Sequence, residues 1–286
     1  MLFTSIINGL LLGGMYAAVG VGFSLVWGVM NTVNLSHGAM IMMGAYTTYW
    51  MSQYIGVNPL WFVPVAMLVT LFIGYLLQKY VINLTMKSGT NMTLILSHGF
   101  NLFLVNAAYI LWKGDYRSIQ SPFSGQGLNL FGTTVPYSRL IVFAIAIIVA
   151  ILLQLFLSRT KTGTAIRATA QNKDAAQLVG VNISRIYSIT FAIGCGLAGV
   201  AGALMSTNFV VTPTFGDPFI GRAFAVAVLG GLGTVSGAVL GGLVLGLAET
   251  LGALAFGPSF QNAIAFAILV LVLVIRPQGL MGKKFF

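Results

Sequence analysis

The sequence predicts an all-α fold: a polytopic transmembrane helix bundle of about eight to nine spans, forming a single domain over residues 1–286. Hydrophobic residues make up 58% of the chain and charged residues only 6%, whereas roughly a quarter of the residues in soluble domains are charged. No Asp, Glu, Lys or Arg occurs before Lys79. The apolar runs have about the length that crosses a bilayer, ~20 residues for ~30 Å of hydrocarbon.

Nine apolar runs are predicted as spans, at residues 3–29, 39–54, 60–82, 92–112, 139–157, 186–207, 219–232, 236–256 and 260–275. The first run lacks a basic flank and exceeds signal-peptide length, so we expect an uncleaved span. The second and seventh runs are short. Short or interrupted helices are tolerated only where they face protein or a water-filled cavity, and in transporters they indicate the pathway.

Basic residues predict the orientation, because cytoplasmic loops carry an excess of Lys and Arg. Nine spans place three basic groups on the cytoplasmic side: Lys79 with Lys87, the loop 159–185, and the tail with Arg276, Lys283 and Lys284. The amino terminus is then outside and the carboxyl terminus is cytoplasmic. The longest exterior loop, 113–138, contains a predicted hairpin at residues 128–136. The net charge of +10 is attributed to lipid headgroups and orientation, not to nucleic acid.

The chain has 14 basic and 4 acidic residues, and six of these charged residues lie in the loop 159–185. It is predicted to form two short helices, 163–171 and a second one with Asn172 as N-cap, Asp174 in the first turn and Gly180 at the C′ position. Its acid-Ala-Ala-x-x-x-Gly pattern resembles the cytoplasmic loop of ABC importer permeases, in which such a smooth helix seats on a partner ATPase. The alternative is an ordinary capped surface helix. The candidate ATPase-coupling residues are Gly163, Arg167, Asn172, Asp174, Ala175, Ala176 and Gly180.

Polar residues inside or beside the spans are candidates for a pathway or gate. His37, with Asn34 and Ser36, lies between the first two runs, either in a broken helix that lines a gate or in a capped cytoplasmic turn. His98 lies within a span, where it lines the pathway or bonds a neighbouring helix. Glu249 is the only acid within the predicted spans, and intramembrane carboxylates normally face an interior or a cavity.

Arg222 is the expected partner of Glu249, because both residues should lie toward the outer side. The pair either fastens two helices or contacts substrate, and Arg222 can attract a carboxylate at the outer mouth.

Glycines spaced four residues apart predict close helix packing, because small residues let helix backbones approach each other in lipid. One set is Gly233, Gly237 and Gly241, and another is Gly242 with Gly246.

Three segments, in order along nearly the whole chain, resemble branched-chain amino acid ABC transporter permeases of the LivH type. They are N-x-V-N-L-S-H-G-A-M-I-M-M-G-A-Y at residues 31–46, R-T-x-x-G-x-A-I-R-A-x-A-Q-N-x-x-A-A-x-L-x-G-V at 159–181, and A-F-A-V-A-V-L-G-G-L-G-T-V-S-G-A-V-L-G-G-L-V-L-G-L-A-E at 223–249. The chain departs from the family pattern at Ser236, Ala39, His98 and Asn101.

The resemblance implies a multi-pass permease of a bacterial inner membrane that pairs with a second permease, which we expect to be a different chain. Two cytoplasmic ATPases and a periplasmic binding protein complete the system, which imports branched-chain or related amino acids. ATP and Mg²⁺ are expected on the ATPases, and no cofactor is expected on this chain.

Two other functional classes fit less well. A stand-alone channel or facilitator for a small polar solute, such as urea or an amide, leaves the basic loop without a role. An intramembrane enzyme would need a set of metal ligands or a nucleophile–base pair, and the four acids and two histidines of the sequence suggest neither. We therefore do not expect an enzyme. Cys195 is the single cysteine, so neither a disulfide nor a cysteine-based metal site is available.

Overall fold

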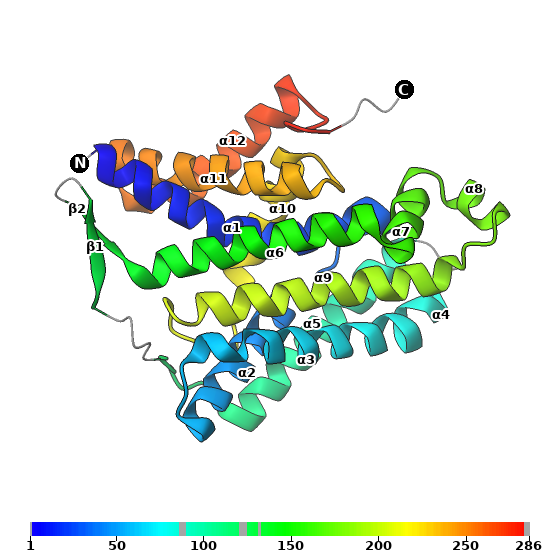
Figure 1. The fold of residues 1–286 in the computed structure, drawn as a ribbon, viewed down its shortest axis with the longest axis horizontal. Coiled ribbons are helices and arrows are strands. Elements are labelled where there is room, and N and C mark those ends of the chain that lie inside the picture. Colours follow the sequence, from blue (N-terminus) through cyan, green and yellow to red (C-terminus); the bar gives the residue numbers. More distant parts are fainter. Residues whose placement is uncertain (1, 86–89, 120–124, 131–132, 283–286) are drawn as a thin grey trace.

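A computed structural model describes residues 2–85, 90–119, 125–130 and 133–282 as a bundle of helices with one β-hairpin (Figure 1). The helices are α1 (Leu2–Met30), α2 (His37–Ile55), α3 (Val63–Leu77), α4 (Asn83–Thr85), α5 (Thr90–Trp112), α6 (Tyr137–Arg159), α7 (Lys161–Gln171), α8 (Lys173–Leu178), α9 (Ile183–Met205), α10 (Asp217–Gly230), α11 (Val235–Phe256) and α12 (Gln261–Ile275). Short 3-10 turns η1 (Pro59–Phe62) and η4 (Pro258–Phe260) precede α3 and α12, and a π-helical turn η2 (Gln78–Ile82) follows α3. The basic residues Lys87, Lys283 and Lys284 lie outside the described residues.

Seven helical stretches within these ranges are long and apolar enough to cross a membrane: Leu2–Met30, Pro59–Ile82, Met92–Trp112, Tyr137–Arg159, Ile183–Met205, Val235–Phe256 and Pro258–Ile275. The predicted all-α polytopic bundle is therefore confirmed. The two predicted spans that are missing from this set are the short ones, which correspond to α2 and α10. Helix α10 has 14 residues, about 21 Å at 1.5 Å per residue, and is too short to cross ~30 Å of hydrocarbon.

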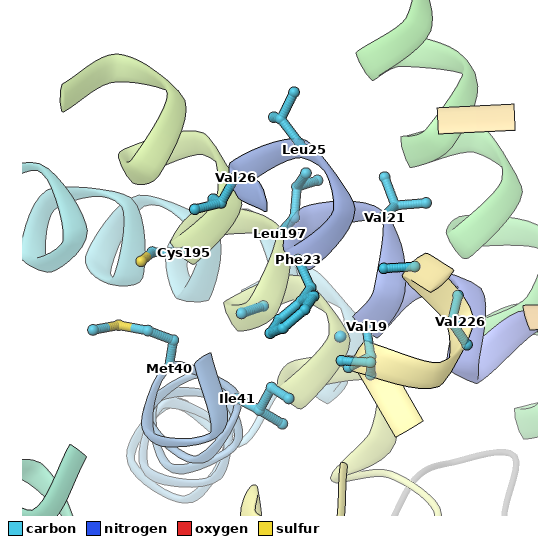
Figure 2. Packing of buried hydrophobic residues seen from close by; sticks show 14 of the residues in the cluster. Val19, Val21, Phe23, Leu25, Val26, Met40, Ile41, Cys195, Leu197 and Val226 are labelled. Carbon is cyan, nitrogen blue, oxygen red and sulfur yellow. The ribbon is translucent and has the colours of Figure 1, made fainter. Parts of the chain in front are cut away.

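Helices α1 and α9 form the centre of the bundle. Of their most apolar stretches, 83% in α1 and 89% in α9 are buried, against 11–33% in the other five. Figure 2 shows the contact: Phe23 of α1 lies between Ile41 of α2 and Leu197 of α9, and Val26 of α1 points toward the side of Cys195 of α9. The outer helices present their remaining apolar faces outward, as expected for a protein surrounded by lipid.

The chain turns back into the bundle before α2 begins. Asn31, in the left-handed region at φ 51, ends α1, and this conformation is one that Asn adopts more readily than most residues. The Asn34 side chain then lies 3.9 Å from Sγ of Cys195, midway along α9, and His37 Nε2 lies 3.0 Å from the carbonyl oxygen of Val19, midway along α1. Helix α2 therefore starts in the interior of the bundle.

Helix α10 starts next to the beginning of α2. A Cβ on Gly38 would lie 2.7 Å from the Ile220 side chain and 3.2 Å from the carbonyl oxygen of Gly216. The first turns of both short helices thus meet inside the protein.

Two features mark opposite ends of the bundle in Figure 1. Strands β1 (Gly127–Leu130) and β2 (Thr133–Pro136) pair antiparallel in the predicted hairpin and lie beside the amino terminus. Helices α7 and α8 lie at the other end. At the hairpin end, Arg117 and Val211 also exchange two backbone hydrogen bonds, of 3.1 and 2.7 Å, which join the segments that follow α5 and α9.

Candidate functional site

A cavity of about 460 Å³ lies toward the hairpin end of the bundle. Five elements contribute to its wall: α1, α6, α10, α11 and α12, together with Phe209 from the segment between α9 and α10. The lining residues are Asn8, Leu12, Met15, Tyr16, Arg139, Phe209, Phe219, Arg222, Thr250 and Gln261. A volume of this size is within the range of ligand pockets, ~300–1,000 Å³.

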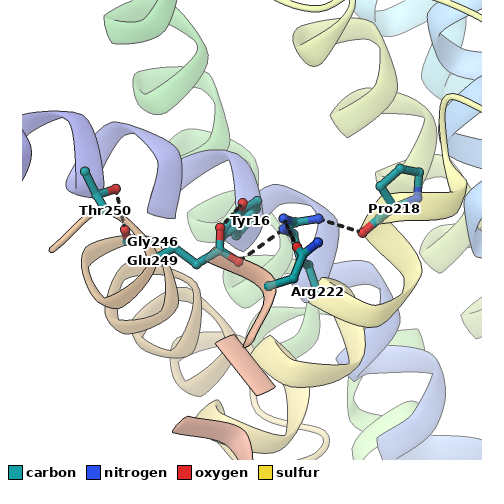
Figure 3. Close-up of polar contacts among 7 residues, drawn as sticks. Tyr16, Pro218, Arg222, Gly246, Glu249 and Thr250 are labelled. Atoms are coloured by element: carbon teal, nitrogen blue, oxygen red, sulfur yellow. Dashed lines mark hydrogen bonds and ion pairs between the residues drawn. The ribbon is translucent and has the colours of Figure 1, made fainter. Parts of the chain in front are cut away.

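Arg222 of the cavity wall and Glu249 behind it form the ion pair that the sequence suggested, with 3.1 Å between Nε and Oε1 (Figure 3). The carboxylate is buried, with 1% of its side chain exposed, and its second oxygen accepts a hydrogen bond of 2.6 Å from the Tyr16 hydroxyl. A buried charge is costly unless it is paired and hydrogen-bonded. Both carboxylate oxygens of Glu249 are paired in this way, one with Arg222 and the other with Tyr16.

The rest of the Arg222 guanidinium is also engaged. One terminal nitrogen donates to the carbonyl oxygen of Pro218 at 3.0 Å, and the other donates to Asn262 Oδ1 at 2.7 Å. The ring of Tyr16 lies 5.5 Å from the guanidinium carbon. This network connects four helices, because its members lie in α1 (Tyr16), α10 (Arg222), α11 (Glu249) and α12 (Asn262). The geometry favours a role for Arg222 in fastening helices over a role as a free receptor for a substrate carboxylate.

A second polar cluster surrounds the beginning of α2. The buried side chains of Asn34 and Ser36 bond to each other, at 2.6 Å between Oδ1 and Oγ. His37 is fully buried, and its Nδ1 has no hydrogen-bond partner among the described residues. The cluster is an interior break in the helical structure and not an exposed turn.

Two side chains of α5 accept hydrogen bonds from the backbone at the start of α2. Ser97 Oγ accepts from the Leu35 N–H at 3.2 Å, and Asn101 Oδ1 accepts from the Ala39 N–H at 3.1 Å. The local N-cap residue, Ser36, makes no side-chain cap bond of its own. The first N–H groups of a helix need acceptors, and here a neighbouring helix supplies them. His98 is exposed on α5, whereas Ser97 and Asn101 are buried.

The loop between α6 and α9 contains two helices at the end of the bundle opposite the hairpin. Helix α7 turns Gly163, Ile166 and Thr169 toward the bundle, and a Cβ on Gly163 would lie 2.6 Å from the Cα of Leu157 in α6. Arg167 is on the exposed side.

Helix α8 has an N-cap, a buried alanine and a glycine-dependent end. Asn172 Oδ1 accepts from the Ala175 N–H at 2.9 Å, Asp174 lies in the first turn, and Ala176 is 3% exposed. Gly180 has φ 87. The N–H groups of Gly180 and Val181 donate to the carbonyl oxygens of Gln177 and Ala176, which is the Schellman arrangement.

The glycines of α11 lie at helix crossings. Gly242 and Gly246 face Gly13 of α1, and Gly237 and Gly241 face Gly230 of α10. The predicted ladder is wrong for Gly233, which lies before α11 with φ 79. The chain reverses between α10 and α11 at this point, and the positive φ that the reversal requires is not a helical conformation. Gly233 therefore does not share a helix face with Gly237 and Gly241. Gly233 instead packs against Gly28 and donates its N–H to Ser24 Oγ at 3.1 Å.

Sequence reasoning missed several residues of these clusters: Tyr16, Ser97, Arg139 and Asn262. Each is an ordinary polar residue with no motif around it, and only the fold brings it to the cavity or to α2. Asn101 had a signal, since it departs from the family pattern within a span.

Known proteins are similar to this chain over nearly its whole length. The family model described as "Branched-chain amino acid transport system / permease component" matches residues 5–273. The permease BraD of Pseudomonas aeruginosa is 33% identical, with 97% of this chain and 95% of BraD covered. LivH of Escherichia coli K12 is 29% identical, with 96% and 94% covered, and LivM of Salmonella typhimurium is 26% identical, with 93% and 67% covered. No solved structure matches. The chain therefore belongs to the family of permease components of branched-chain amino acid transport systems.

Proposed function

We propose that this chain is the membrane-spanning subunit of an ABC importer that moves branched-chain or related amino acids across a bacterial inner membrane, driven by separate ATPase subunits. BraD, LivH and LivM are permease proteins of high-affinity branched-chain amino acid transport systems, which supports this substrate class. The chain acts as one permease domain over residues 1–286. It binds no cofactor and catalyses no reaction itself, since ATP and Mg²⁺ bind to the partner ATPases.

The observation that carries the proposal is the exposed end of α8. Leu178 and Val179 are 89% and 80% exposed, on a capped helix that follows a basic helix at the far end of the bundle (Figure 1). Because α8 lies outside the stretches that can cross a membrane, exposed apolar side chains on it favour a protein contact over a lipid contact. An ATPase that binds over Leu178 and Val179 can push on α8, and α7 passes the movement to α6 and the centre of the bundle, because Gly163 is packed against α6.

The proposed topology counts α2 and α10 together with the seven long stretches. The amino terminus and the hairpin are then periplasmic, and α7, α8 and the segment after α12 are cytoplasmic. The observation that supports this arrangement is the placement of the hairpin and of α8 at opposite ends of the bundle.

The proposed pathway follows the outer cavity and the interior starts of α2 and α10. Asn34, Ser36 and His37 supply polar groups where the helices are interrupted, and Arg222 lies on the cavity wall. Non-helical backbone at membrane depth is tolerated where it is buried in protein or lines a cavity. A role for His98 stays a prediction.

The proposed assembly contains this chain, a second permease, two cytoplasmic ATPases, a periplasmic binding protein and the surrounding lipids. The second permease is a different chain, because Salmonella typhimurium has both a LivH and a LivM that are similar to this protein.

Reconstitution tests the function directly. The complete assembly in proteoliposomes should accumulate leucine, isoleucine or valine against a gradient, only with ATP on the ATPase side. A facilitator would equilibrate its solute without ATP, so ATP-independent flux that stops at equal concentrations would reject the proposal. Failure of the ATPases to copurify with the chain would also count against it.

A further inference from the structure

We propose that the outer cavity is a binding site for the carboxylate of an amino acid and that Arg139 receives this carboxylate. The inference rests on the proposed function. It adds a substrate contact within the permease itself and assigns that contact to a residue that no motif indicates.

The charge on the cavity wall points to an anion. The wall contains two arginines, Arg139 and Arg222, and no acidic side chain among the described residues. Glu249 neutralises Arg222 from outside the lining, at 3.1 Å. The cavity therefore keeps one uncompensated positive charge, that of Arg139.

The hydrogen bonds of the two arginines separate their roles. Arg222 donates to Glu249, Pro218 and Asn262 through all three of its nitrogens. Arg139 makes one described hydrogen bond, from Nη1 to Asn8 Oδ1 at 3.1 Å. A guanidinium has five N–H donors in a planar fork that fits a carboxylate, so Arg139 keeps most of its donors for a ligand while Arg222 is held in place.

The remaining wall suits the other parts of an amino acid. Leu12, Met15, Phe209 and Phe219 supply apolar surface for an aliphatic side chain. Thr250 and Gln261 supply oxygen atoms for the ammonium group. A mostly apolar cavity with a few polar groups is typical of small-molecule sites.

The test measures binding of labelled leucine to the assembly of both permeases and both ATPases in lipid nanodiscs, without the periplasmic binding protein, which would bind leucine itself. Two analogues serve as competitors: 4-methylpentanoate, which lacks the ammonium group, and leucinamide, which lacks the carboxylate. In the unmodified protein, 4-methylpentanoate should compete with leucine and leucinamide should not. Arg139→Gln should weaken leucine binding by about 10- to 100-fold, the factor expected for the loss of a charged hydrogen-bonding partner, and Arg139→Lys should restore part of it.

Lys113→Gln is the matched control, since it removes an exposed basic residue from the same proposed exterior side, at a position that does not line the cavity. Its leucine binding should equal that of the unmodified protein. Equal losses in both variants would mean that bulk charge is responsible, and the site assignment would be wrong.

Other outcomes also decide the question. If leucine binding is absent in the unmodified assembly, or unchanged in Arg139→Gln, the cavity is not the proposed site. If Arg139→Gln weakens docking of the periplasmic protein but leaves carboxylate competition intact, Arg139 contacts that protein and the proposal fails. ATP-driven uptake by the unmodified assembly is measured separately and decides the transport function whatever the result at Arg139.

Discussion

The side-chain oxygen of Asn101 in α5 accepts a hydrogen bond from the backbone N–H of Ala39 in α2, at 3.1 Å. The donor belongs to the first turn of a helix that starts inside the bundle, where Ala39 is fully buried. Asn101 therefore holds the beginning of α2 in position from a neighbouring helix.

Asn101→Leu should destabilise the protein, because it leaves the Ala39 N–H buried without an acceptor. Such a loss costs ~1–3 kcal/mol. Asn106→Leu is the control, since Asn106 is exposed on the same helix and its one side-chain bond among the described residues goes to the carbonyl oxygen of Leu102 in its own helix. Thermal unfolding in the same detergent should show a lower melting temperature for Asn101→Leu alone, and equal values for both variants would contradict the positioning role.

Glu249→Gln should lower stability by removing the charge partner of Arg222. Breaking a fully buried pair costs ~3–5 kcal/mol, and the 19% exposure of Arg222 places the expected loss at or below the lower end of this range. Adding Arg222→Met should recover part of the loss, because no uncompensated charge then remains. A double-mutant cycle on unfolding free energies measures the interaction energy between the two residues. Additive effects would show that the two residues do not stabilise each other.

Gly241→Ala should be destabilising, because the new methyl group would lie 2.5 Å from the carbonyl oxygen of Val226 and 2.8 Å from the nitrogen of Gly230. Overpacking costs ~1–3 kcal/mol, and Gly241→Leu should cost more. Gly99→Ala, in α5, has nothing within 4 Å of the added atom and should not be destabilising. If Gly241→Ala keeps its melting temperature but transports slowly, the glycine serves as a hinge and not as a packing residue.

Ala176→Pro should reduce ATP hydrolysis and uptake together while the protein still inserts. Proline removes the N–H that donates to the carbonyl oxygen of Asn172 at 3.0 Å and breaks the short helix. Lys173→Pro is the control, because the first position of a helix accepts proline. Normal uptake in Ala176→Pro would remove α8 from the coupling mechanism.

Cysteines at Lys173 and Gln126 should differ in their accessibility to an impermeant maleimide. Both positions are exposed, at opposite ends of the bundle, and the single native cysteine, Cys195, is buried. In intact cells we expect labelling at position 126 and none at 173 until the membrane is opened. Labelling at position 173 from outside would invert the proposed topology.

The sequence by itself determined the class of fold. Apolar runs of bilayer length with so few charges predict membrane-spanning helices, because a helix satisfies its backbone hydrogen bonds internally. It also determined the caps of α8: Asn172 and Gly180 act through bonds to residues a few positions away, and such local geometry can be read from the chain. The pairing of Arg222 with Glu249 was predictable for a different reason. A lone acid in a span requires a partner, and few bases lie on the same side.

The tertiary structure alone decided which residues gather around the cavity and around the start of α2. Arg139, Tyr16 and Asn262 come from three different helices, and their proximity depends on how those helices pack, which no local pattern encodes. Gly233 shows the same limit, because four-residue spacing grouped it with Gly237 and Gly241, whereas the chain reverses at Gly233 and packs it against Gly28 of α1. Asn101 was noticed as unusual, but its purpose required the position of a donor 62 residues away, which only the packed bundle supplies.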